Sequence, residues 1–396
     1  MRCEELLCVL SDYWKSQMKD SVVIFGAGAV ARGFIGRLLV EKGLTPVFVE
    51  VDPQLAKSLQ QADGYTVHLT GAETRNYFVT GYRVLTPEQH EEISKCLVDC
   101  LFAATAVGGQ NLRAVASIVA LDLGHNSNKR GRPHYILVCE NWPEADKVLA
   151  EALSDAGCDR RSFACVSCSV ERIVRRKDSG LDLIAEGGQA VYVDSRGWKG
   201  KHAANVCGID GLTFSDNIEA IYARKLFTSN AGGAALAYIG RLSGCHYIHE
   251  ALEIPEIRKD LTDLLNAAKQ ALVESFSLNG AELELHLDEL MTARLPNRGL
   301  ADTVQRVGRN PLRKLGSQER LAGLAHLLKR CALATAPACR VIGAALHYRD
   351  PADPESLELG RIIAQKGAGA VLKDVCGFTE GDRCFDECLA FYDYYA

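Results

Sequence analysis

A short glycine turn near the start of the chain restricts the fold more than any other feature. The apolar run VVIF at 22–25 leads into GAGAVA at 26–31, and the helix-like run ARGFIGRLLVEKG follows. Gly26 permits a tight turn, Gly28 leaves room for a pyrophosphate, and Ala31 takes a third position where close packing of helix on strand accepts Gly or Ala. A strand, a glycine turn and a helix in this order predict the first unit of a dinucleotide-binding sheet.

The two parts of the chain differ in their hydrophobic pattern. Up to about residue 205, β-rich runs at 22–25, 46–51, 100–107 and 134–140 alternate with helical segments, which is typical of parallel strands joined by crossover helices. Beyond that point helical periodicity dominates. We therefore expect an α/β fold with an N-terminal extension at 1–20, a Rossmann-type parallel sheet domain at 21–205 and a mostly α-helical C-terminal domain at 206–396.

An acidic residue follows the second predicted strand. Glu50 lies about 20 residues beyond the glycine turn, where a carboxylate can bind the ribose diol of a dinucleotide. Asp52 competes with Glu50 for this role. Because a carboxylate there repels the 2′-phosphate of NADP, the pattern predicts NAD. Ligands lie beyond the carboxyl ends of parallel strands, so we expect further cofactor-binding residues at two later strand ends: Thr105, Val107, Gly108 and Asn141.

Composition limits the kinds of binding partner and the cellular location that we expect for this chain. With 45 basic and 50 acidic residues the net charge is −5, and the absence of a long basic run argues against nucleic acid. No apolar run reaches the ~18 residues of a membrane span. The first 20 residues contain acidic residues where a signal peptide has a positively charged region and an apolar core. The fifteen cysteines lack zinc-site spacing. These patterns predict a cytoplasmic protein without metal and with a small-molecule substrate. We further expect a monomer or weak homodimer.

The stretch KLFTSNAGG at 225–233 lies in a predicted helix that begins near Asp216 and closes at Gly244. On an ideal α-helical wheel Lys225, Asn230 and position 233 fall at 0°, about 140° and about 80°, on one broad face. A desolvated lysine can take the hydroxyl proton during alcohol oxidation, and an asparagine amide can donate to the developing oxyanion. A solvated surface lysine is the alternative interpretation. Glycines in mid-helix cost about 1 kcal/mol each, which favours a functional reason.

Several motifs together resemble the polyol-specific long-chain dehydrogenases of the mannitol dehydrogenase family. ARKLFTSNAGGAALAYIGRLSG resembles the signature helix of that family, whose pattern is Lys, four residues, Asn, two residues and His. GAGAVARGFIGRLL, TAVG, CEN, ERIV, RVGRNPLRKL and AALHYR resemble further family motifs in the same order, over roughly residues 21–350.

The resemblance implies NAD-dependent interconversion of mannitol 1-phosphate and fructose 6-phosphate. Lys225 would be the general acid/base, Asn230 the oxyanion donor, and Asn141 would lie near nicotinamide and substrate. Arg306 and Lys314 would bind the polyol chain, and the guanidinium groups around them suit a phosphate monoester. The full set of expected substrate-binding residues is Asn141, Glu171, Arg294, Asn297, Arg306, Arg309, Arg313, Lys314 and His347, with Arg349 as a further candidate.

The chain also departs from the family pattern. Gly233 stands where the family has His, and Glu171 stands where it has Asp. Arg175 and Arg176 replace the usual prolines. The loss of one preorganised donor can cost on the order of 10²-fold in rate. Two alternatives therefore remain beside the polyol-phosphate dehydrogenase: a related polyol or uronate-type reductase, and a non-catalytic NAD- or sugar-phosphate-binding protein. The family has no counterpart of the residues before Met18, which is either the true start or preceded by an added helix.

Overall fold

The computed structural model describes residues 21–71, 73–126, 133–142, 144–177, 180–188, 191–198 and 211–396. The expectations for residues 1–20, including the role of Met18, fall outside these ranges. The chain divides into two compact units, of which the first ends at Ile218 and the second begins at Glu219.

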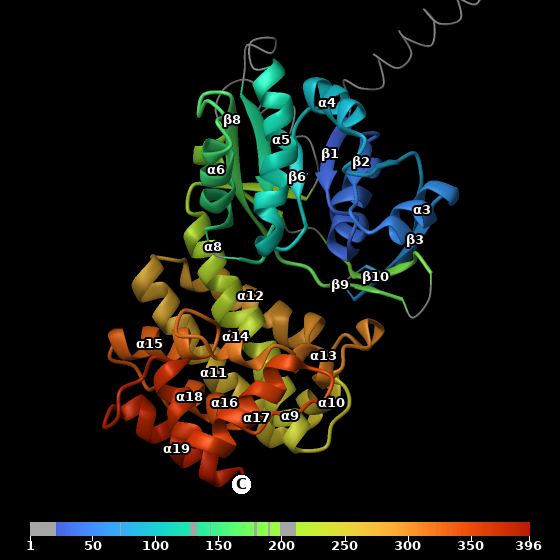
Figure 1. Ribbon diagram of the computed structural model, residues 1–396. Helices are drawn as coiled ribbons and strands as arrows, with labels where there is room; N and C mark the ends of the chain where they lie inside the picture. The colour runs from blue at the N-terminus through green and yellow to red at the C-terminus, as the bar shows by residue number, and fades with distance from the viewer. Residues whose placement is uncertain are drawn as a thin grey trace, which may run out of the picture. The chain divides into compact units, whose positions relative to one another are not determined.

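Within its described residues, the first unit contains an eight-stranded sheet in the order β12-β11-β8-β7-β6-β1-β2-β5 (Figure 1). All neighbouring strands run parallel except β11 and β8, which pair antiparallel. The parallel core agrees with the predicted Rossmann-type fold, whereas the antiparallel step was not predicted. The strands are β1 (Ser21–Phe25), β2 (Thr45–Val49), β5 (Arg83–Leu85), β6 (Ala103–Thr105), β7 (His134–Val138), β8 (Phe163–Val170), β11 (Val191–Asp194) and β12 (Leu212–Ser215).

Side chains of successive strand residues point to opposite faces of this sheet, so each face has its own core. One face, with Val23 and Phe25, is covered by α4 (His90–Asp99), α5 (Leu112–Asn126) and α6 (Ala145–Asp155), which lie side by side in Figure 1. The other face, with Val22 and Ile24, packs against the π-helical η1 (Ala31–Gly36) and α2 (Arg37–Glu41). Burial of both faces explains why the strands read as continuous apolar runs.

A second sheet in the first unit was not predicted. Within the described residues it has four strands in the order β4-β3-β10-β9, namely β4 (Arg75–Val79), β3 (Tyr65–Thr70), β10 (Leu183–Glu186) and β9 (Val174–Arg176). Its buried residues, such as Val67 and Leu183, belong to the same core as η1. The remaining short elements of this unit are α3 (Pro53–Gln61), η2 (Gly109–Asn111) and η3 (Ser195–Gly197).

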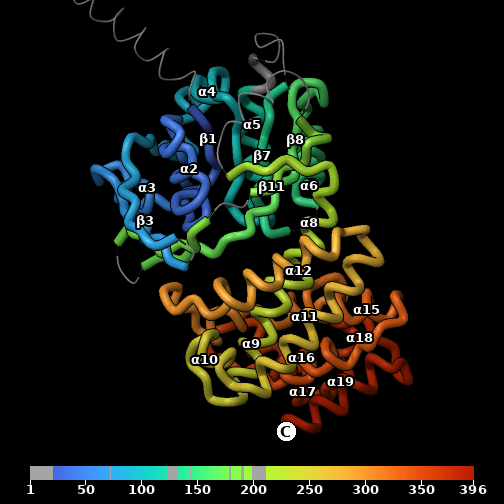
Figure 2. The backbone as a smooth tube through the Cα atoms, turned by 180° about the vertical axis from the view of Figure 1, so that it is seen from behind, coloured from blue at the N-terminus to red at the C-terminus, as the bar shows by residue number. Residues whose placement is uncertain are grey.

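The second unit is helical throughout its described residues (Figure 2). Helix α9 lies in its core, because nine of its twelve residues are buried and it packs against α10, α11, α13 and α16. The elements are α8 (Ile218–Lys225), η4 (Leu226–Asn230), α9 (Ala231–Leu242), α10 (Ile248–Glu253), α11 (Pro255–Phe276), α12 (Gly280–Glu289), η5 (Leu290–Arg294), η6 (Arg298–Leu300), α13 (Val304–Gly308), α14 (Pro311–Leu315), α15 (Ala322–Arg330), α16 (Ala336–Leu346), α17 (Pro354–Lys366), α18 (Ala368–Asp374) and α19 (Arg383–Tyr394).

Helix α8 begins at Ile218, the last residue assigned to the first unit. Among the helices that the structure describes, none combines the length and apolarity needed to cross a membrane.

Candidate active site

The glycine turn of the first unit has the geometry that a dinucleotide requires. Gly26 has φ +91°, and a Cβ there would come within 2.7 Å of the Ala106 carbonyl oxygen, so only glycine fits. At Gly28, by contrast, a Cβ would meet no atom within 4 Å. The backbone at Gly28 is therefore open to a ligand, and Ala31 is fully buried behind it at the start of η1.

The structure places Glu50 and Asp52 in different positions relative to this turn. The buried Glu50 carboxylate accepts hydrogen bonds from the backbone N–H of Ala27, at 2.6 Å, and of Asp52, at 2.9 Å. The Asp52 side chain instead caps α3 by accepting from the N–H groups of Gln54 and Leu55. Each carboxylate oxygen of Glu50 can accept a second hydrogen bond. Glu50 thus remains the predicted ribose ligand, and Asp52 has a helix-capping role.

A buried arginine supports the turn from behind. The Arg32 guanidinium donates from Nε to the Ala27 carbonyl oxygen at 2.7 Å and from Nη1 to the Leu181 carbonyl oxygen at 2.6 Å. It also lies over the ring of Tyr65, 5.2 Å from its centroid. Burial lowers the pKa of Arg32 and raises that of Tyr65. Sequence reasoning did not identify Arg32, because its acceptor at Leu181 is far away along the chain.

The strand ends of β6 and β7 come together as predicted for two neighbouring parallel strands. Thr105 pairs with Val138, and Thr105 is fully buried with no hydrogen-bond partner for Oγ1 among the described residues. The Glu140 carboxylate accepts from the backbone N–H of Val107 at 3.0 Å and of Gly108 at 2.8 Å. This bond pair holds the loop after β6, while Asn141 is exposed beside it. Glu140 is a positioning residue that the sequence analysis did not select.

In the second unit, the lysine and asparagine of the predicted catalytic pair bracket a π-helical turn. Lys225 ends α8, η4 covers Leu226–Asn230, and α9 continues from Ala231. The wheel positions predicted from an ideal α-helix are therefore wrong for this stretch. Hydrogen bonds from i to i+5 widen the turn, which brings residues five apart, such as Lys225 and Asn230, closer to one face. Both side chains are half-buried.

Contacts from α12 and η5 hold this π-helical turn. The buried Thr228 hydroxyl donates to the Arg224 carbonyl oxygen at 2.6 Å and lies 3.0 Å from His286 Nε2 of α12. Arg294, at the end of the π-helical η5, donates from Nη1 to Ser229 Oγ at 3.3 Å. The predicted substrate residue Arg294 therefore contacts the residue that directly precedes Asn230 in the sequence. A Cβ at Gly233 would meet only Val307 Cγ1, at 3.7 Å, so a larger side chain has room to start there.

Five basic side chains gather around α13 and α14 and are called the cationic cluster here: Arg306, Arg309, Arg313, Lys314 and Arg320. Thr303 caps α13 by accepting from the Arg306 N–H. Between the two helices Asn310 takes a left-handed conformation at φ +57°, and its N–H donates to Asp353 Oδ2 at 2.7 Å. These turns help to bring basic residues that are up to fourteen positions apart in the sequence into one group.

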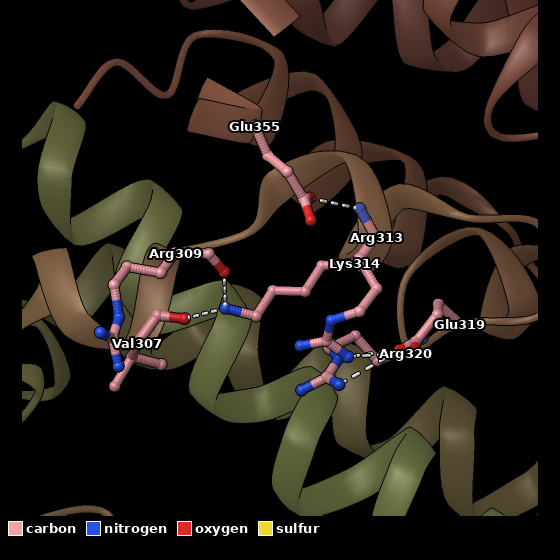
Figure 3. A network of polar contacts seen from close by, with 7 residues as sticks. All are labelled: Val307, Arg309, Arg313, Lys314, Glu319, Arg320 and Glu355. Carbon is pink, nitrogen blue, oxygen red and sulfur yellow. Dashed lines mark hydrogen bonds and ion pairs between the residues drawn. The ribbon is translucent and has the colours of Figure 1, made fainter. Parts of the chain in front are cut away.

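Two carboxylates neutralise part of this charge. Asp302 accepts two bonds from Arg306, at 2.5 Å from Nε and 2.6 Å from Nη2. Glu319 accepts from Arg313 at 3.2 Å and from the buried Arg320 at 3.1 Å, as Figure 3 shows. Arg309 and Arg313 are exposed. The exposed guanidinium groups can bind the oxygens of an anion in pairs.

Lys314 lies buried inside the cluster. Its Nζ donates to the carbonyl oxygens of Val307 and Arg309 (Figure 3). Burial, together with the charges of Arg320, Arg313, Arg309 and Arg306, lowers the pKa of Lys314 to about 7. A neutral amine still has two N–H groups, which is enough for both carbonyls. Lys314 is thus poised between a neutral and a charged state near neutral pH.

The other predicted substrate residues have structural contacts of their own. Asn297 caps η6 by accepting from the Gly299 N–H at 3.1 Å. His347 stacks on Tyr392 of α19, with ring centroids 4.3 Å apart, and its Nε2 lies 2.8 Å from the Tyr392 carbonyl oxygen. Arg349 donates to the carbonyl oxygens of Leu346 and Tyr348. Glu171 is buried directly after β8 in the first unit. The roles of these four residues toward a substrate stay predictions.

Comparison with known proteins gives the family. The mannitol dehydrogenase Rossmann domain matches residues 20–207, and the mannitol dehydrogenase C-terminal domain matches residues 217–374. A mannitol-1-phosphate 5-dehydrogenase of Arthrobacter sp. (strain FB24) is 34% identical over 371 residues, which are 92% of this chain and 95% of the relative. The mannitol-1-phosphate 5-dehydrogenase of Bacillus subtilis (strain 168) is 33% identical over 366 residues, 89% of this chain and 94% of the relative.

Solved structures agree on the fold. The Pseudomonas fluorescens mannitol 2-dehydrogenase, in a ternary complex with NAD and D-mannitol, has a TM-score of 0.74 at 14% identity and covers 95% of this chain and 91% of its own. A substrate-free D-sorbitol dehydrogenase has a TM-score of 0.73 at 15% identity and covers 94% and 92%.

The residues of the first unit fit NAD. The open backbone at Gly28, the acceptor at Glu50 and the unsatisfied Thr105 hydroxyl all lie at the carboxyl ends of the central strands, where dinucleotides bind. The family match over nearly the whole chain and this fit agree. The chain belongs to the mannitol dehydrogenase family and is an NAD-dependent polyol oxidoreductase.

Proposed function

We propose that this chain interconverts mannitol 1-phosphate and fructose 6-phosphate. The observation that carries the proposal is the cationic cluster, in which the exposed Arg309 and Arg313 surround a buried, titratable Lys314. A neutral polyol does not need this charge, whereas a phosphate monoester does. The relatives named mannitol-1-phosphate 5-dehydrogenase support the same substrate.

In the proposed division of labour, residues 21–205 bind NAD and residues 206–396 carry the catalytic and substrate groups. Bound NAD would supply the hydride acceptor for the carbinol carbon, and bound NADH the hydride donor for the carbonyl carbon. Lys225 takes the hydroxyl proton as the carbonyl forms, and it gives a proton back in reduction. The Asn230 amide donates a hydrogen bond to the same oxygen as charge develops there. Arg306 and Lys314 hold the polyol chain, with Asn141 near its reacting end.

The second candidate function is a related reductase of a different polyol or a uronate-type sugar acid. Gly233 and Glu171 favour it, because they alter the expected pocket. A non-catalytic binding protein is the third candidate. Retention of Lys225 and Asn230 on the π-helical turn argues for catalysis.

The test is substrate discrimination by the purified chain with NADH. We expect kcat/KM for fructose 6-phosphate to exceed that for fructose by about 100-fold, because charge-assisted hydrogen bonds contribute ~1.5–3 kcal/mol each. Arg313→Gln should lower kcat/KM about tenfold or more for the phosphate and leave fructose unchanged. Arg361→Gln is the control, since Arg361 pairs with Glu358 on the surface of α17.

Equal rates with both sugars, or the same loss for both in Arg313→Gln, would refute a phosphate-specific enzyme. Turnover of uronates alone would establish the second candidate function. Tight NADH binding without turnover of any sugar would favour the third.

A further inference from the structure

An exposed tryptophan lies at the carboxyl edge of the sheet, in a place that the known chemistry of the family motifs does not explain. Trp142 follows Asn141 in the loop after β7, which ends at Val138, and 45% of its surface is exposed. At an edge of the sheet where a ligand binds, the flat face of an exposed indole is available for contact with that ligand. The other tryptophan in the described residues, Trp198, is 5% exposed and stacks on Tyr135.

The neighbouring loop is shaped to receive the indole. A Cβ at Gly109 would come within 2.0 Å of Trp142 Cε3 and within 2.4 Å of Cδ2. Only glycine at position 109 therefore allows the ring to lie where it does. Because Glu140 holds the backbone of Val107 and Gly108, the loops after β6 and β7 form one connected surface. One part of the indole rests on this surface, and the rest faces outward.

The strand order of the sheet indicates which end of a dinucleotide would reach the surface formed by the loops after β6 and β7. Strand β1 has β2 on one side and β6, then β7, on the other, so the topological switch point lies at β1. If the adenosine ribose binds Glu50 at the end of β2, the pyrophosphate passes the turn at Gly26 and Gly28. The other nucleotide half must then extend over the ends of β6 and β7. The buried Thr105 hydroxyl, which has no partner among the described residues, lies at the same edge.

We propose that Trp142 is a cofactor-binding residue that forms a wall of the NAD site at its nicotinamide end. The indole is held against Gly109, and its exposed surface contacts the nicotinamide ring. Stacking of a flat heterocycle on an aromatic side chain is the chemistry involved. The inference rests on NAD binding by the first unit and does not depend on which sugar is the substrate.

The experiment measures energy transfer from tryptophan to bound NADH, without any sugar present. Indole emission overlaps the absorption of reduced nicotinamide, so a contacting tryptophan sensitises NADH fluorescence. The chain has three tryptophans, and a Trp14→Phe background leaves Trp142 and Trp198 as the reporters. In this background Trp142→Phe should reduce the sensitised emission to the part that Trp198 contributes, and Trp142→Ala should raise the NADH dissociation constant about tenfold.

A matched variant moves the ring without deleting it. Gly109→Ala forces the indole away from its place, so we expect weaker NADH binding, again by about tenfold, with all tryptophans retained. Leu121→Ala is the control. Leu121 is 51% exposed in the later part of α5, toward the edge of the sheet where the strands begin, and its removal should leave NADH binding unchanged.

Two results would overturn the proposal: sensitised emission that is not reduced in Trp142→Phe, or NADH affinity that is unchanged in Trp142→Ala. Circular dichroism checks that the variants fold. Should they not fold, the Trp14→Phe chain alone decides, by acrylamide quenching with and without NAD. Saturating NAD should shield the exposed indole from acrylamide, and unchanged quenching would contradict the contact.

Discussion

Among single residues, Lys314 and Gly233 offer two direct tests of the proposed chemistry. Lys314 is surrounded by the positive charges of Arg306, Arg309, Arg313 and Arg320. Burial of the side chain and these charges both favour the neutral amine, while an arriving phosphate would favour the ammonium. The protonation state of Lys314 is therefore linked both to folding and to the occupancy of the cationic cluster.

The pH dependence of stability tests the state of Lys314. Its pKa is about 7 in the folded chain and about 10.4 in an unfolded one. Between these values the unfolded chain binds one more proton, so the free energy of unfolding should rise with pH. Below about pH 7 both states are protonated, so the free energy of unfolding no longer changes with pH through this group and stays at its lower value. Urea denaturation at pH 7 and pH 9 should show the rise in the wild type and a smaller one in Lys314→Met.

Substitutions at Gly233 test whether the missing histidine limits the rate. Gly233→His has space, because a Cβ there meets only Val307 Cγ1 at 3.7 Å. The added donor should raise kcat for fructose 6-phosphate at least about tenfold. Gly233→Ala is the control: it should stabilise α9 by about 0.5–1 kcal/mol without any gain in kcat. If the histidine variant is no faster than the alanine variant, another group already fills the role.

At the scale of elements, the π-helical turn η4 is the feature that sequence reasoning could not supply. The helical period predicted one continuous helix containing Lys225 and Asn230, and the chain is helical there. The widened turn depends on contacts with α12 and η5, through His286 and Arg294. Since these partners are about 60 residues away along the chain, the local hydrophobic period cannot predict their contacts with η4. Glu140 and Arg32 escaped selection for the same reason.

Removal of the Thr228 hydroxyl tests the role of η4. Thr228→Val keeps the shape but loses the bond to the Arg224 carbonyl and the contact with His286. We expect a loss of about 1–2 kcal/mol in the free energy of unfolding. We also expect a lower kcat, because η4 would no longer hold the side chains of Lys225 and Asn230 in fixed positions relative to each other. Thr228→Ser retains the hydroxyl and should keep most of the rate. Normal kcat in the valine variant would show that the turn does not need this anchor.

At the scale of the whole molecule, the strand-turn-helix motif and the change of periodicity predicted the fold class, because they follow from local spacing. The second sheet and the antiparallel pairing of β8 with β11 were missed, since they join segments such as 65–70 and 183–186 that lie far apart in sequence. Likewise Lys225 and Asn230 could be proposed from one predicted helix, and their roles stay predictions, while the surroundings of Lys314 required the folded cationic cluster.

The most direct test is the initial rate of NADH oxidation with fructose 6-phosphate, measured for the wild type, Lys225→Ala and Lys259→Ala. Lys259 is an exposed lysine of α11 paired with Asp263, and its replacement should leave the rate unchanged. We predict turnover by the wild type and a loss of about 10²–10⁴-fold in Lys225→Ala, as for the removal of a general acid/base. A wild type that binds NADH without turnover, or a Lys225→Ala variant as fast as the wild type, would contradict the account.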